Sequence, residues 1–209
     1  MKQLIENITL LPNQFWVFLT ATASGFGWAV RQYFVRTKKN RNIYERILPA
    51  YDAIYDSLND IIGRSKNCTR ALILKCENGG GVPELGKAIH SSGVAEARKI
   101  STNRKKEWQK QRLDPVYIKN LLRLMTARDR SIFLNAEDFK GSVIYDVYSV
   151  DSVQCVKLSH LFSTKKSWYY LSCTFDIEEK SVEPEDRNII RSNVNAIRSV
   201  LEKNKDILN

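Results

Sequence analysis

The chain has few of the residues that build metal sites or disulfides. Its 209 residues include two histidines and four cysteines. No two cysteines form a C-x-x-C pair, so we expect neither a zinc site nor another metal. The cysteines are far apart in the sequence, and three lie in apolar, strand-like runs (Cys68, Cys76, Cys155 and Cys173). This distribution is typical of buried free thiols in a reducing compartment.

Charged residues are absent from positions 15–30. As a helix this run would span about 24 Å, and extending it through Tyr33, Phe34 and Val35 reaches the roughly 30 Å of a bilayer core. Aromatic residues near the two ends resemble the aromatic belts of membrane helices. We therefore predict one N-terminal transmembrane helix within residues 1–35, followed by a basic linker at 36–42.

A basic cluster follows the uncharged run, and it includes Arg31, Arg36, Lys38, Lys39 and Arg41. By the positive-inside rule, the C-terminal domain would then face the cytoplasm from the inner or cytoplasmic membrane, with anionic lipid headgroups as partners. Three other interpretations of the run remain open. It could be a buried core helix, a cleaved signal peptide ending near Ala21-Thr22-Ala23, or a helix lying in the membrane interface.

The remaining sequence has an ordinary globular composition, with 43% hydrophobic and 27% charged residues. The net charge of +10 favours an anionic partner, either nucleic acid or a membrane surface. Besides the juxtamembrane cluster, a second basic run contains Arg98, Lys99, Arg104, Lys105, Lys106 and the aromatic Trp108. Such a run could bind phosphates and stack one base, so nucleic acid is the second choice of partner.

Hydrophobic spacing predicts three helices, at 43–62 (ended by Gly63), 115–128 (capped by Asp114) and 184–203. Apolar runs predict strands at 70–75, 131–134, 153–158 and 168–175, and two short strands within 88–101 with a bend at Ser91-Ser92-Gly93. Residues 143–150 fit either a short helix or a strand, and an acidic loop at 137–138 precedes them. The order predicts an α+β domain over 43–204 with one antiparallel or mixed sheet.

The segment Arg70-Ala71-Leu72-Ile73-Leu74-Lys75, followed by Glu77-Asn78-Gly79-Gly80, resembles the first strand and "NG" turn of GAF-like domains, sensor modules related to PAS domains. Residues 153–158 and 168–175 are similar to that family's closing hairpin, and helices 43–62 and 184–203 match its terminal helices. Short membrane-anchored members occur in bacteria and bacteriophages, and this chain resembles those. The residue before Asn-Gly is often histidine in them, whereas this chain has Glu77.

The resemblance implies a ligand held between the sheet and the helix at 115–128. The residues it points to are Leu74, Cys76, Glu77, Asn78, Val156 and Tyr170 from the sheet side and Tyr117, Leu121 and Met125 from the helix. Apart from Glu77 and Asn78, these side chains also suit a plain hydrophobic core.

Three patterns suggest catalysis only weakly. Residues 81–87 fit the phosphate-binding spacing G-x-x-x-x-G-K, but Ala88 stands where magnesium needs a hydroxyl and Pro83 removes an amide. His90 is adjacent to Ser91 and Ser92 without a nucleophile elbow. The carboxylates Glu77, Glu137 and Asp138 have no metal-binding spacing, and His160 fits a residue at a strand end.

These observations predict a non-enzymatic, membrane-anchored GAF-like protein without a cofactor. It would bind a small ligand or a protein partner, including a second copy through its terminal helices. The alternative is a basic nucleic-acid-binding protein whose N-terminal apolar helix belongs to the core.

Overall fold

The computed structural model describes residues 45, 47–78, 88–99 and 111–205. The chain divides into two compact units, Met1–Arg46 and Ile47–Asn209. The predicted membrane helix, the linker at 36–42, the loop at 79–87 and the basic residues at 100–110 lie outside the described residues. In the described ranges, no helix is both long enough and apolar enough to cross a bilayer.

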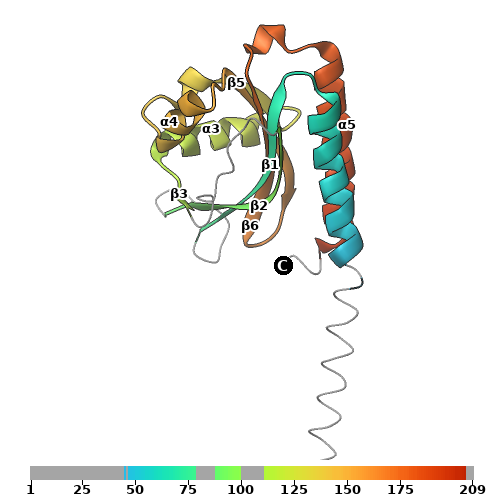
Figure 1. Cartoon of the computed structure of the whole chain (residues 1–209). Coiled ribbons are helices and arrows are strands. Elements are labelled where there is room, and N and C mark those ends of the chain that lie inside the picture. Colours follow the sequence, from blue (N-terminus) through green and yellow to red (C-terminus); the bar gives the residue numbers. More distant parts are fainter. Residues whose placement is uncertain (1–44, 46, 79–87, 100–110, 206–209) are drawn as a thin grey trace, which may run out of the picture. The chain divides into compact units, whose positions relative to one another are not determined.

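A six-stranded antiparallel sheet is the central layer of the second unit (Figure 1). Across the sheet the strands are β3 (Gln111–Arg112), β2 (His90–Arg98), β1 (Cys68–Glu77), β6 (Ser167–Phe175), β5 (Cys155–Ser163) and β4 (Ser131–Asn135). The two central strands have the long apolar runs expected of strands covered on both faces. The structure thus confirms the predicted first strand and the predicted closing hairpin.

The prediction of two short strands within 88–101 was wrong, because β2 is one continuous strand. The Ser91-Ser92-Gly93 segment does not bend the chain away. Instead the register against β1 shifts between Ile73 and Leu74, where Ala95 and Gly93 are the partners and Val94 is the extra residue. A bulge accommodates an extra residue while the ladder continues on both sides.

Within the described residues, two helices cover each face of the sheet (Figure 1). Helix 47–64 and α5 (Pro184–Lys203) lie together on one face, while α3 (Pro115–Thr126) and α4 (Val143–Val150) lie on the other. Asp114 caps α3 by accepting a hydrogen bond from the Tyr117 amide, as predicted. The ambiguous segment 143–150 is helical, capped by Ser142, and the acidic residues 137–138 belong to the short 3₁₀ helix η1 (Ala136–Phe139). Helix 47–64 continues past Gly63, which we had predicted to end it.

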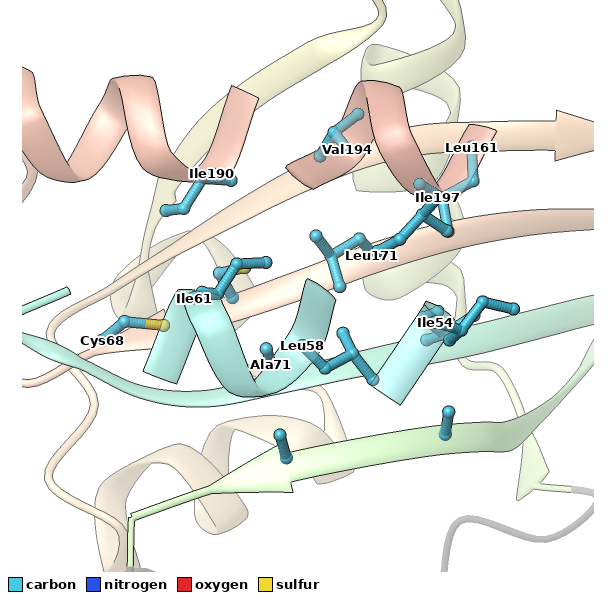
Figure 2. Packing of buried hydrophobic residues seen from close by; sticks show 14 of the residues in the cluster. Ile54, Leu58, Ile61, Cys68, Ala71, Leu161, Leu171, Ile190, Val194 and Ile197 are labelled. Carbon is cyan, nitrogen blue, oxygen red and sulfur yellow. The ribbon is translucent and has the colours of Figure 1, made fainter. Parts of the chain in front are cut away.

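The terminal helices bury one face of the sheet in a hydrophobic core (Figure 2). Leu58 and Ile61 from helix 47–64 meet Ile190 and Ile197 from α5 above Leu171 on β6, and all five side chains are fully buried. Each such side chain contributes about 1.5–3 kcal/mol to folding. The four cysteines are buried and unpaired by disulfides, as the sequence predicts, and Cys68, Cys155 and Cys173 belong to this core.

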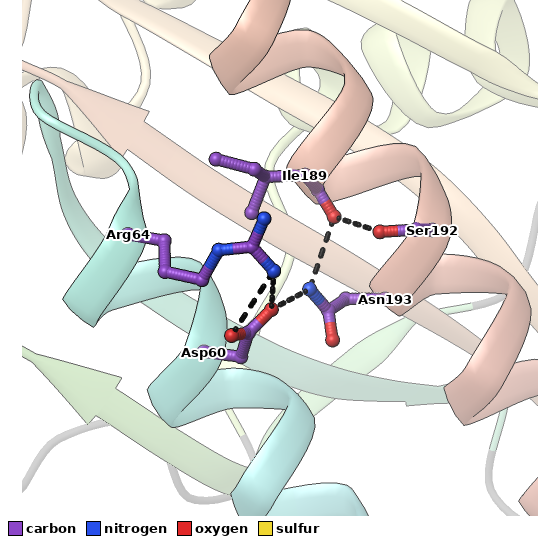
Figure 3. A network of polar contacts seen from close by, with 5 residues as sticks. All are labelled: Asp60, Arg64, Ile189, Ser192 and Asn193. Carbon is purple, nitrogen blue, oxygen red and sulfur yellow. Dashed lines mark hydrogen bonds and ion pairs between the residues drawn. The ribbon is translucent and has the colours of Figure 1, made fainter.

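A polar network also joins the two terminal helices (Figure 3). The Asn193 amide on α5 donates to the Asp60 carboxylate at 2.8 Å and to the Ile189 carbonyl at 3.0 Å. Arg64 donates to the same carboxylate from the next turn of helix 47–64. A directional contact of this kind fixes the register of one helix against the other, which apolar packing alone specifies less sharply.

Candidate functional site

The layer between the sheet and α3 is a second hydrophobic core. Leu72 and Leu74 on β1 and Leu158 on β5 point into this layer, because alternate residues of a strand share a face. Tyr117, Leu121 and Leu124 of α3 cover them. The fully buried side chains on both sides show that α3 packs directly on the sheet in this region.

Hydroxyl and thiol groups form a buried cluster within this layer. The Tyr170 hydroxyl lies 3.1 Å from the Tyr117 hydroxyl and 3.3 Å from the Ser91 hydroxyl. The Cys76 thiol contacts Ser91 and Tyr170 as well. These four residues come from β1, β2, β6 and α3, and we refer to them as the hydroxyl cluster.

The hydroxyl cluster is held in its neutral form. Burial raises the pKa of the Cys76 thiol to about 12, although hydrogen bonds from Ser91 and Tyr170 partly oppose the rise. Burial also raises the pKa of Tyr117 and of Tyr170 well above the usual value of a tyrosine. A neutral thiol is a poor nucleophile, so this arrangement provides hydrogen-bonding groups rather than a reactive centre.

A buried arginine marks the far end of the same face of β1. The Arg70 guanidinium lies 3.0 Å from Glu96 on β2 and 3.0 Å from Asp151, the residue that follows α4. The side chains of Arg70 and Asp151 are 2% and 3% exposed. This ion-paired group joins β1, β2 and the end of α4, and the local sequence around Arg70 does not predict it.

The residues that suggested catalysis are separated or occupied in the structure. His90 and Ser91 are successive residues of β2 and so point to opposite faces of the sheet. Glu77 forms an ion pair with Lys75 at 2.7 Å, whereas Glu137 accepts from Tyr145 and Asp138 pairs with Arg123. Among the described residues, no three His, Cys, Asp or Glu side chains are grouped to hold a metal ion.

His160 was predicted at a strand end, and this was wrong, because it is buried within β5. Its Nε2 lies 2.8 Å from the Ser163 hydroxyl. Burial, together with the nearby cations Arg130 and Arg198, lowers the pKa of His160 to about 4. The imidazole is therefore neutral at pH 7.

Comparison with solved structures shows what this arrangement resembles. A red/green cyanobacteriochrome in its red light-absorbing state aligns with a TM-score of 0.51 and 10% identity over 77% of this chain and 98% of that one. The photoproduct state of a GAF domain from Synechocystis sp. aligns with a TM-score of 0.50 and 11% identity over 76% and 97%. The fold is GAF-like. At these identities the likeness concerns the fold alone.

A further alignment pairs the chain with the GAF domain of a two-component sensor histidine kinase from Bacillus halodurans, at a TM-score of 0.49 and 12% identity over 76% of this chain and 97% of that one. No protein-family model matches the sequence, and no curated protein is significantly similar to it.

In this GAF-like domain, most of the predicted ligand residues come together. Leu74, Cys76, Val156, Leu121, Tyr117 and Tyr170 all belong to the core between the sheet and α3. Met125 is half-buried and lies outside that core, and Glu77 and Asn78 are half-buried at the end of β1. Whether these residues bind a ligand stays a prediction. Ser91, which completes the hydroxyl cluster, was not predicted, because we expected a bend at its position.

The described part of the predicted basic surface is partly engaged within the GAF-like domain. The Lys99 ammonium donates to the Lys66 carbonyl at 2.6 Å, and its amide donates to the Thr69 carbonyl. Through these two hydrogen bonds, Lys99 joins the end of β2 to the segment between helix 47–64 and β1 and to the start of β1. Arg98 is half-buried at the end of β2, and the remaining residues of that surface lie outside the described residues.

The outer surface of helix 47–64 carries an apolar stripe. Leu48, Tyr51 and Tyr55 are 65%, 44% and 39% exposed. The two tyrosine rings are stacked, with centroids 6.5 Å apart. Beside the stripe, an apolar hollow of about 180 Å³ opens between Ala50 and Ile54 of this helix, Ala95 and Tyr169 of the sheet, and Leu201 of α5.

Proposed function

We propose that the chain is a non-catalytic, membrane-anchored GAF-like protein that acts by binding a protein partner through its terminal helices. The partner we propose first is a second copy of the same chain. The single observation that carries the proposal is the exposed stripe of Leu48, Tyr51 and Tyr55 beside an apolar hollow. Contiguous exposed apolar side chains are typical of interaction surfaces, and tyrosine is common at their centres.

The described core favours a protein partner over a ligand enclosed beneath α3. Tyr117, Leu121 and Tyr170 occupy the layer between the sheet and α3 with their own side chains, and the hydroxyls satisfy one another. A ligand entering this layer would have to displace packed side chains. The neutral thiol and tyrosines also support a binding role rather than a catalytic one.

The membrane anchor is tested by fractionating the full chain beside a truncated chain that begins at Arg36. We expect the full chain to stay in the membrane pellet after carbonate and high-salt washes, since about 20 apolar residues inserted as a helix resist both. We expect the truncated chain to be released. A full chain that is removed by salt alone would contradict the anchor and favour the nucleic-acid alternative, because phosphate contacts weaken steeply with salt.

The partner surface is tested by replacing Leu48, Tyr51 and Tyr55 together with glutamine. Sedimentation velocity of the detergent-solubilised full chain should show a dimer for the wild type and a dissociation constant at least about 30-fold higher for the variant, since two tyrosines and a leucine at an interface centre carry that much binding energy. The matched control is Val150→Gln on α4, which removes a comparably exposed apolar side chain from the opposite face. Equal dimerisation of the triple variant and the control would refute the proposed surface.

A small ligand is the second candidate, and the hydroxyl cluster is the observation that favours it. Cys76, Ser91, Tyr117 and Tyr170 place four polar groups in an otherwise apolar layer, near the end of β1 and the start of β2. A few convergent polar groups among apolar side chains are typical of small-molecule sites. In this role the hydroxyl cluster would orient a polar group of the ligand.

A further inference from the structure

Basic side chains gather along the seam between α5 and the edge of the sheet formed by β5 and β4. Arg187, Arg191 and Arg198 lie on one side of α5, because spacings of four and seven residues return to the same helix face. α5 packs on β5, and β4 is the last strand of the sheet on this side. The three arginines therefore follow one seam.

One end of the seam is built around Phe133. This residue of β4 lies opposite Lys157 of β5, so both side chains point to the same face. The Lys157 ammonium lies 4.8 Å from the Phe133 ring centroid, and the Arg187 guanidinium carbon lies 4.3 Å from it. Two cations thus share one aromatic ring, and Lys157 is half-buried beside it.

The other end is fixed by the backbone of His160. Its carbonyl accepts hydrogen bonds from Arg198 Nε at 2.9 Å and Nη2 at 2.5 Å. Its amide donates to the Arg130 carbonyl at 2.9 Å, which holds the turn before β4 against β5. Between the two ends, the hydroxyls of Ser131 and Ser159 lie 3.0 Å apart.

Of the four cations of this seam, Arg187 has a carboxylate within ion-pair distance, and its Nε and Nη2 donate to the carbonyls of Val182 and Glu179. Of the acids nearby, Glu179 lies 3.8 Å from Arg187, while Asp129 and Glu202 act at longer range. In the described ranges, no carboxylate lies within ion-pair distance of Lys157, Arg191 or Arg198. Burial lowers the pKa of Lys157, and Arg187 and Arg191 lower it further, so the cations repel one another. Repulsion between like charges destabilises the folded state unless an anion is bound.

We propose that Lys157 and Arg191 of this seam, with Arg187 beside them, form a binding site for a phosphate group, either free or on a lipid headgroup. Guanidinium groups match the geometry of phosphate oxygens. The low dielectric around a half-buried ammonium strengthens its attraction to a phosphate. The seam is on the face of the sheet opposite α3, so the site is separate from the hydroxyl cluster. It is also independent of the partner surface on helix 47–64.

The site is tested on the full chain by thermal unfolding in sodium phosphate and in sodium chloride of the same ionic strength. At a phosphate concentration ten times the dissociation constant, the melting temperature should rise by about 3–5 °C over chloride. Arg191→Gln should lose at least half of this gain while melting no lower than the wild type in chloride, because one repelling charge is removed. The matched control Lys119→Gln, an exposed lysine on α3, should keep the whole gain.

Two phosphate esters distinguish the sources. A larger rise in melting temperature with glycerol 3-phosphate indicates a free phosphate ligand. A larger rise with the diester glycerophosphoglycerol indicates the headgroup of an anionic lipid. Equal melting temperatures of the wild type in chloride and in phosphate overturn the proposal. A full phosphate-dependent rise in the melting temperature of Arg191→Gln overturns it as well. If Arg191→Gln melts lower in chloride, Lys157→Gln replaces it, and retention of the full gain there overturns the proposal too.

Discussion

Replacing Arg70 with alanine should lower the free energy of unfolding by about 3–5 kcal/mol, because it leaves buried carboxylates without their cation. The guanidinium lies between Glu96 and Asp151, and the Asp151 side chain is almost as deeply buried as Arg70 itself. Urea denaturation followed by circular dichroism should show a lower midpoint with an unchanged slope, as expected when stability alone changes.

Two variants separate the loss of the cation from the loss of packing. Arg64→Ala removes an exposed arginine from an ion pair on helix 47–64 and should cost less than about 1 kcal/mol. The triple variant Arg70→Met, Glu96→Gln and Asp151→Asn keeps the volume of the group without its charges. It should recover much of the stability that Arg70→Ala loses, because a buried ion pair is often no better than neutral groups of similar size. An Arg70→Ala midpoint equal to that of Arg64→Ala would show that the ion-paired group is dispensable.

Elements with a strong local pattern could be predicted from the sequence. β1 and β6 have long apolar or aromatic runs, and α3 and α5 begin with Asp114-Pro115 and Glu183-Pro184. β2 was mispredicted because Ser91-Ser92-Gly93 resembles a turn. Pairing with β1 on one side supplies the hydrogen bonds that keep this weak segment extended. α4 has only eight residues, which is too short for periodicity to distinguish a helix from a strand.

The candidate sites depend on residues that are distant in sequence, and for this reason the sequence predicts them only in part. Arg70 and Asp151 are 81 positions apart, and no local pattern links them. The sequence drew attention to the continuous basic run at 98–112, whereas the basic seam combines α5 residues four and seven positions apart with Lys157 of another element. The helical spacing of Arg187, Arg191 and Arg198 was the signal that could have found three of its four cations.

The protein-partner role and the small-ligand role differ in whether side chains fill the layer between the sheet and α3. The substitution Tyr170→Ala tests this directly. Tyr170 is 2% exposed and belongs to the core between the sheet and α3. Removing its ring should cost about 3–5 kcal/mol, as for other large-to-small substitutions in cores. Because the new cavity would be lined by apolar side chains and the hydroxyls of Ser91 and Tyr117, phenol should bind there.

Phenol binding distinguishes a new cavity from a loss of stability without one. Phenol at ten times its dissociation constant should return about 1.4 kcal/mol of stability to Tyr170→Ala, since a ligand that binds only the folded state stabilises it by mass action. Tyr170→Phe, which keeps the ring and removes the hydroxyl, should cost about 1–3 kcal/mol and gain nothing from phenol. If phenol stabilised the wild type as strongly as Tyr170→Ala, a cavity would already be present beside α3. The small-ligand role would then be favoured over the protein-partner role, because the side chains of the GAF-like domain would not fill this layer by themselves.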